Sequence, residues 1–265
     1  MVAAGVLLLL AMIALFAPIV APYNPTTQLD IDTLRSLPPS LAHPFGTDPY
    51  SRDVLSRVIY GARISLGIAL VATVIAVTLG TIYGAIAGYA GGATDALMMR
   101  TVDAMLAIPR VLLAIVIVAL WQTPSVWVLV AILGGTGWFM LSRQVRGQVF
   151  AHRAREYVLA AEALGSSRSR ILVRHILPNV VPTIIVAAAL GVGQVIVLEA
   201  GLSYLGLGVQ PPDASWGNII QDGADRIRSL WWLSVFPGLF IVATTVAFNS
   251  LGDTLHEWLD PRVNR

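Results

Sequence analysis

The chain has 265 residues, of which 56% are hydrophobic and 12% are charged, and its formal net charge at pH 7 is +2. Soluble domains carry about 25% charged residues, so this composition excludes an ordinary water-soluble protein, and the small net charge argues against a nucleic-acid partner. Cysteine is absent and the four histidines lie far apart, so neither a disulfide nor a metal site is expected, and no cofactor is predicted.

The first predicted transmembrane helix covers residues 1–22, which are uncharged and rich in Leu, Ala and Ile. A cleaved signal peptide is the alternative. Such a peptide has a basic segment before a short apolar core, whereas this apolar core is long and no Lys or Arg precedes it. The abrupt apolar start suggests that a basic cytoplasmic tail precedes this sequence.

Residues 23–63 are predicted to form an external loop with an interfacial helix. Residues 23–50 are rich in Pro, Thr and Asp, which is typical of an extended segment without its own core. Ser51 is expected to cap a short amphipathic helix that lies along the membrane surface. Within this helix, Asp53 and Arg57 are expected to pair one turn apart.

Residues 64–265 are predicted to be the core transmembrane domain, with a cytoplasmic loop at residues 153–178. Five further apolar segments are expected to cross the membrane, at residues 64–92, 95–121, 126–142, 180–200 and 229–251. The first of these is dense in glycine and β-branched residues, which permit close packing of helices in lipid. A Gln-Thr-Pro-Ser break at residues 122–125 separates the second from the third.

Basic residues in the loop between the fourth and fifth of the six spans set the predicted orientation. This loop has two glutamates and seven arginines, namely Arg143, Arg146, Arg153, Arg155, Arg168, Arg170 and Arg174. By the positive-inside rule the loop is cytoplasmic. Counting spans then places both termini in the cytoplasm and residues 23–63 outside.

The same loop contains a short amphipathic stretch. Four residues at helical spacing form a narrow face of small and apolar groups: Tyr157, Ala160, Ala161 and Leu164. Gly165 is placed to end this helix in a left-handed cap, and Ser166 or Ser167 can cap a second short helix. Small residues let another protein's backbone approach closely, so the hairpin suits docking better than catalysis. The stripe alone is equally typical of an interfacial helix that anchors a loop.

The hairpin resembles the EAA loop of ABC importer permeases, in Ala160, Ala161 and Gly165 and in the closing Leu177-Pro178-Asn179. In that family the loop inserts into a groove of the ATP-hydrolysing subunit. Leu159 departs from the general pattern, which has Glu, and His175 departs from the Ile of the pattern. The resemblance therefore implies an ATPase-coupling surface made of Tyr157, Ala160, Ala161, Leu164, Gly165, His175, Leu177 and Pro178.

Residues 43–48 (HPFGTD) and 202–217 (LSYLGLGVQPPDASWG) are similar to the C-type permease of dipeptide, oligopeptide and nickel importers. This resemblance implies an all-α integral membrane protein with about six transmembrane helices and a type I ABC importer permease fold. The expected location is a bacterial or archaeal plasma (inner) membrane. The implied partners, besides the lipid bilayer, are a second homologous permease, two ABC ATPase subunits and an extracytoplasmic solute-binding protein.

The resemblance implies transport of di- or oligopeptides, with nickel or another small solute as the alternative. The sequence has no G-x-x-x-x-G-K-[ST] motif, so the chain is not expected to hydrolyse ATP or to be an enzyme. Two other classes are weighed against this interpretation. An ATP-independent secondary transporter predicts inverted repeats, and an intramembrane enzyme needs a nucleophile near a base. The sequence shows neither feature.

Three ionisable residues in or at the ends of apolar spans, Asp103, Arg110 and Glu199, are candidates for the translocation path or its gate, because an ionised group in lipid is costly unless it is paired or hydrated. Asp103 could instead form a structural pair with Arg100 on the neighbouring turn. Arg110 could instead extend toward the interface. Glu199 is expected near the outer mouth.

Overall fold

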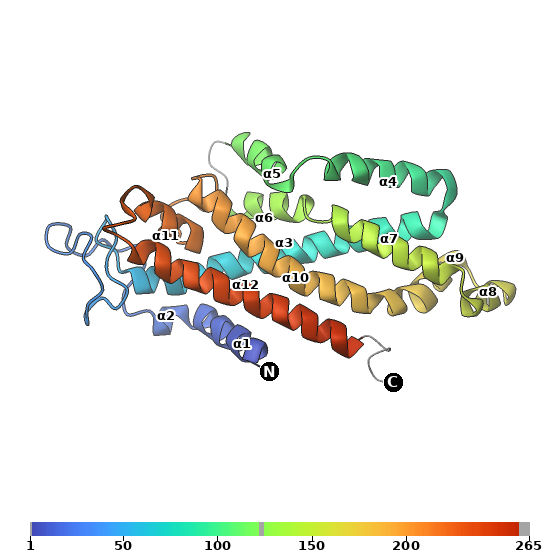
Figure 1. Ribbon diagram of the computed structural model, residues 1–265, viewed down its shortest axis with the longest axis horizontal. Coiled ribbons are helices and arrows are strands. Elements are labelled where there is room, and N and C mark those ends of the chain that lie inside the picture. Colours follow the sequence, from blue (N-terminus) through green and yellow to red (C-terminus); the bar gives the residue numbers. More distant parts are fainter. Residues whose placement is uncertain (1, 122–124, 260–265) are drawn as a thin grey trace.

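The computed structural model describes residues 2–121 and 125–259, and the secondary structure in these ranges consists of helices (Figure 1). Residues 122–124 of the predicted Gln-Thr-Pro-Ser break lie outside the described residues. The fourth residue of that break, Ser125, is the N-cap of α6 (Val126–Gly135), and its hydroxyl accepts a hydrogen bond from the backbone N–H of Val128. A helix therefore begins where the sequence predicts that one begins.

The long helices run along one axis, with loops at one end of the molecule and two short helices at the other (Figure 1). One end, called the loop end here, consists of residues 21–53 and α11 (Trp216–Gly223). The opposite end, called the hairpin end, consists of α8 (Glu156–Ala163) and α9 (Arg168–Ile171).

Four helical runs in the described ranges are long and apolar enough to cross a membrane: α3 (Val54–Ala90), Val126–Arg153, Arg168–Tyr204 and α12 (Trp232–Leu259). The second run joins α6 to α7 (Phe139–Arg153), and the third joins α9 through the π-helix η1 (Leu172–Ile176) to α10 (Leu177–Tyr204). These runs confirm an all-helical integral membrane fold.

The predicted span at residues 95–121 is a bent pair of helices. Its parts are α4 (Gly92–Leu106) and α5 (Arg110–Ala119), which meet at an angle of 79°. Pro109 is the N-cap of α5, and a proline has no N–H to continue the hydrogen bonds of α4. If the pair is one span, the described chain has five candidate crossings by length and composition.

The first predicted helix is divided near its end. α1 (Val2–Leu15) is followed after Phe16 by the single turn α2 (Ala17–Val20), which has Pro18 in its first positions. Fourteen residues of helix extend about 21 Å, which is less than the roughly 30 Å of a hydrocarbon core. In the described residues α1 is thus shorter than a full crossing, which makes six spans an approximate count.

The prediction of a separate interfacial helix after Ser51 is wrong. α3 is a single helix of 37 residues that begins at Val54 and continues through the predicted second span. Asp53 caps it by accepting a 2.8 Å hydrogen bond from the backbone N–H of Ser56. No proline interrupts residues 54–90, so the helix that begins at Val54 continues without a break through the apolar segment.

A row of glycines on α3 faces α7. A Cβ at Gly80 would lie 2.9 Å from the Trp138 carbonyl oxygen, and a Cβ at Gly88 would lie 2.6 Å from that of Arg146. Both distances are shorter than real Cβ contacts, so the two backbones approach more closely than side chains would permit. The expected close packing of this glycine-rich span is confirmed.

Buried charges hold the loop end together. Arg57 of α3 is 2% exposed, and its Nη1 lies 2.6 Å from carboxylate oxygens of both Asp48 and Asp222. Arg52 contacts the same two carboxylates at 2.6 and 2.9 Å. These four residues are called the ionic cluster below. The predicted pair between Asp53 and Arg57 is wrong, because the Asp53 carboxylate instead lies 2.9 Å from His43 Nδ1.

Candidate functional site

The hairpin end begins with α8, whose C-terminus has the geometry of a Schellman motif. Gly165 has a φ of +78° and donates its N–H to the Glu162 carbonyl at 2.9 Å, while Ser166 donates to the Ala161 carbonyl at 3.1 Å. A positive φ favours glycine because other residues have a Cβ that crowds the backbone. The predicted left-handed cap at Gly165 is confirmed.

An apolar floor supports the hairpin. Val158 of α8 is fully buried, Ala161 is 8% exposed, and Ile171 of α9 is 1% exposed. They pack in one cluster with residues of α3, α7, η1 and α10, including Ala85, Val145, Val149, Ile176 and Val180. Helices of eight and four residues are too short to be stable alone, so this floor fixes their position.

The opposite face of α8 is open to solvent. Leu164 is 87% exposed and Tyr157 is 39% exposed, and Ala160 lies on the same exposed side. The predicted four-residue face therefore needs one correction, because Ala161 turns into the floor. The sequence pattern grouped Ala161 with Ala160. Adjacent side chains on a helix point about 100° apart, so Ala160 can face solvent while Ala161 packs against the floor.

Tyr157 is held at the edge of this face by a hydrogen bond. Its hydroxyl lies 2.8 Å from His152 Nδ1 of α7. Partial burial raises the pKa of the Tyr157 phenol from its ordinary value near 10, so the side chain is neutral at physiological pH. The surface that α8 presents is therefore uncharged at Tyr157, Ala160 and Leu164.

The remaining predicted coupling residues lie where the hairpin returns to the long helix. His175 is in the π-helix η1, and its carbonyl accepts a 2.7 Å hydrogen bond from Asn179 Nδ2. Leu177 and Pro178 form the first turn of α10, where a proline needs no hydrogen-bond partner for its nitrogen. Pro178 and Asn179 are exposed, whereas His175 and Leu177 are half-buried.

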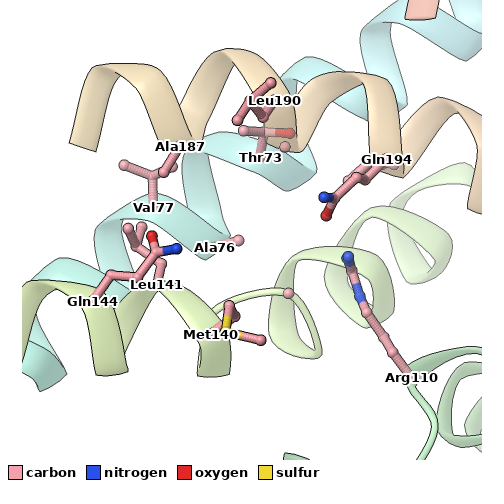
Figure 2. Close-up of a pocket in the computed structure, with 13 residues that line it drawn as sticks. Thr73, Ala76, Val77, Arg110, Met140, Leu141, Gln144, Ala187, Leu190 and Gln194 are labelled. Carbon is pink, nitrogen blue, oxygen red and sulfur yellow. The ribbon is translucent and has the colours of Figure 1, made fainter. Parts of the chain in front are cut away.

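A cavity of about 130 Å³ lies among α3, α7 and α10, beside the side chain of Arg110 (Figure 2). Arg110 Nη2 donates a 2.8 Å hydrogen bond to the Leu133 carbonyl of α6. Gly137 leaves room for this guanidinium, because a Cβ there would lie 2.8 Å from Nη2. Of the three predicted path residues, Arg110 is the one that lines this cavity.

Asp103 and Glu199, the other two predicted path residues, do not line this cavity. Asp103 pairs with Arg143 of α7 at 3.6 Å rather than with Arg100, and both side chains of the pair are 55% exposed, so the pair contributes little stability. Glu199 is 1% exposed, and its carboxylate accepts hydrogen bonds from Ser65 of α3 and Ser203 of α10. It thereby joins two helices, and its role in a path or gate stays a prediction.

Sequence reasoning missed the polar uncharged groups of the cavity. Thr73, Gln144 and Gln194 line it from three helices. Thr73 and Gln194 lie within apolar segments, whereas Gln144 lies between Arg143 and Arg146. A signal for Thr73 and Gln194 was present, because polar side chains inside apolar spans are uncommon. The three residues are far apart in sequence, so only the packing of α3, α7 and α10 brings them together.

Comparison with known proteins gives this geometry a family. Residues 80–265 match the model of the binding-protein-dependent transport system inner membrane component, and residues 1–39 match that of the N-terminal TM domain of oligopeptide transport permease C. The chain belongs to this permease family. It is thus a multi-pass membrane transport component, and its family membership confirms the resemblance seen in the sequence.

Curated relatives cover nearly the whole permease. The chain is 42% identical to the dipeptide transport system permease protein DppC of Bacillus subtilis, over 98% of this chain and 81% of the relative. It is 40% identical to the oligopeptide transport system permease protein OppC of the same organism, over 100% of this chain and 86% of that relative. It is also 40% identical to the OppC protein of Haemophilus influenzae, over 97% and 83%.

Proposed function

We propose that this permease is one subunit of an ATP-binding-cassette importer and forms part of the translocation path for di- or oligopeptides. A second homologous permease completes the path, two cytoplasmic ATPase subunits supply the energy, and an extracytoplasmic solute-binding protein delivers the cargo. Both termini and the hairpin lie in the cytoplasm, as the seven arginines around the hairpin favour. The relatives named for dipeptide and oligopeptide transport support the choice of cargo.

The observation that carries this proposal is the construction of the hairpin. An apolar floor holds the hairpin in place and a glycine cap ends α8. Tyr157, Ala160 and Leu164 then form an exposed strip without charge, flanked by the exposed Glu156 and Glu162. An exposed leucine beside small residues fits a groove on a partner protein. We propose that this groove is on the ATPase subunit.

One helical run connects the hairpin to the loop end. Residues Arg168–Tyr204 form a run of 37 residues, about 55 Å long, which starts in the hairpin and ends beside the loop end (Figure 1). At its far end, α10 packs against α11 of the loop end so closely that a Cβ at Gly217 would lie 2.5 Å from the Ala200 carbonyl oxygen. ATP-driven movement of the ATPase subunits would thus shift the hairpin and, through this run, the loop end.

ATP-dependent uptake of labelled dipeptide into proteoliposomes tests the proposal. The complex is reconstituted with the second permease, the ATPase subunits and the binding protein. Uptake should disappear when ATP or the ATPase subunits are omitted. Uptake by the permease pair alone would instead support an ATP-independent secondary transporter. Competition by nickel but not by peptides would keep the importer class and change the cargo.

Substitution of the glycine cap tests the coupling role of the hairpin. Gly165→Asp adds a side chain at a φ of +78° and a charge in the docking contact, so ATP-dependent uptake should fall at least about tenfold. No atom outside the neighbouring residues lies within 4 Å of the Cβ position, so the chain itself should fold and insert. The measurement is uptake per inserted complex.

Gly165→Asn is the matched control. Asparagine has the size of aspartate without its charge, and it adopts a left-handed conformation more readily than most residues. Its uptake should lie between those of the wild type and Gly165→Asp. Normal insertion of Gly165→Asp together with unchanged ATP-dependent uptake would refute the coupling role.

A further inference from the structure

Two buried polar atoms at the cavity beside Arg110, namely Arg110 Nε and Thr73 Oγ1, have no hydrogen-bond partner within the described ranges. A second cavity, of about 300 Å³, shares Arg110, Gly137, Met140 and Gln194 with the first. Arg110 therefore borders both spaces. Figure 2 shows its guanidinium directed toward the amide of Gln194.

Arg110 retains hydrogen-bonding capacity inside the helix bundle. Its Nε is buried and has no hydrogen-bond partner in the part of the chain that the structure describes, although Nη2 donates to the Leu133 carbonyl. Across residues 2–121 and 125–259, no carboxylate forms a salt bridge with it, in contrast to Arg57 and Arg146, which pair with acidic residues. A cation within apolar helices is costly unless an anion or water compensates it.

A second observation concerns Thr73 on the α3 wall of the same cavity. Thr73 is 5% exposed, and its Oγ1 is buried without a hydrogen-bond partner among the described residues. Gln144 and Gln194 also line the cavity, and their amides add further donors. The site thus offers a fixed positive charge, an unpartnered hydroxyl and amide N–H groups, which is the donor set that a carboxylate requires.

We propose that this cavity binds the terminal carboxylate of the transported peptide, with Arg110 as the cationic contact and Gln194 as a second donor. The inference rests on the proposed function, because it concerns peptides that pass through this permease. A metal cation does not fit, since the guanidinium would repel it and no acidic side chain lines the described cavity. The cavity would therefore select among cargoes by the chemistry of their carboxyl end.

Direct binding provides the test. Radiolabelled dialanine is bound to the purified detergent-solubilised complex of both permeases and the ATPase subunits, without the binding protein. Unlabelled dialanine and dialanine amide then compete with it. Since the amide lacks the negative charge that strengthens a hydrogen bond from Arg110, it should compete at least about tenfold more weakly than the free peptide.

Variants assign the effect to Arg110. Arg110→Gln should weaken binding of dialanine about tenfold and remove the difference between the acid and the amide, whereas Arg110→Lys should restore part of that difference because it keeps the charge. Arg100→Gln removes an exposed arginine of the neighbouring α4 and should leave the binding of both dialanine and its amide unchanged. Each variant is compared at equal amounts of assembled complex.

Several outcomes overturn the inference. They are the absence of dialanine binding to the wild-type complex, equal competition by acid and amide, and unchanged discrimination in Arg110→Gln. If the anion facing Arg110 belongs to the second permease, Arg110→Gln should impair assembly while binding per assembled complex stays normal, which also overturns it. Acid-selective binding without ATP-dependent uptake would instead refute the proposed function and leave this site standing.

Discussion

The loop end and the hairpin end of the permease are stabilised in opposite ways. At the loop end, Asp48 is fully buried and Arg57 is 2% exposed, and each finds its partners within the chain. At the hairpin end, the floor is apolar and the outer face keeps Leu164 87% exposed. The two ends thus differ in their interiors, which are ionic at the loop end and apolar at the hairpin, while both leave some apolar side chains exposed in the described residues, such as Leu41 and Leu164.

The difference follows from the cost of burying charge. A buried ion pair is stable only when all of its partners are in place, so the ionic cluster requires residues 48–57 and α11 to lie in one arrangement. Apolar contacts have no such directional requirement. The hairpin can therefore shift on its floor more easily than the loop end can rearrange, which suits a part that receives a mechanical signal.

The largest effect is expected at the ionic cluster. Arg57→Met removes the cation shared by Asp48 and Asp222 and should lower stability by about 3–5 kcal/mol. The measurement is the midpoint of thermal unfolding in detergent. Arg35→Met, at an exposed arginine of the same segment, should change stability by less than about 0.5 kcal/mol. Equal midpoints for the two variants would contradict a structural role for the cluster.

A smaller and local effect is expected at the floor of the hairpin. Ile171→Ala removes a side chain that is 1% exposed and should cost about 2–4 kcal/mol. Hydrogen–deuterium exchange should accelerate in residues 156–176 and stay unchanged in residues 43–60. Val173→Ala, at a 59% exposed position, is the control. Faster exchange at both ends would show that the two regions are not independent.

The smallest effect on stability is expected at the tip of the hairpin. Leu164→Ser removes exposed apolar surface and should change stability by less than about 0.5 kcal/mol. If the tip docks on the ATPase subunit, the same change should lower dipeptide uptake per ATP hydrolysed by several-fold. Unchanged coupling would show that Leu164 lies outside the contact.

Much of the hairpin could be predicted because its signals are local. The glycine cap after α8 depends on the conformation of one residue, and the sequence identified Gly165 correctly. The prediction of the exposed face of α8 was only partly correct, because residues 160 and 161 are both alanine and the sequence does not distinguish them. Their separation into an exposed and a buried alanine depends on the floor, which includes residues of α3 and α7.

The sequence by itself determined the membrane class, most helical segments, the cap at Gly165 and the family resemblance, because these depend on composition and on residues close in the chain. Only the tertiary structure decided the partners of Arg57 and Asp103 and the grouping of Thr73 and Gln194 around Arg110. Asp222 lies 165 positions from Arg57. Such contacts are set by how distant helices pack, and no local pattern records that packing.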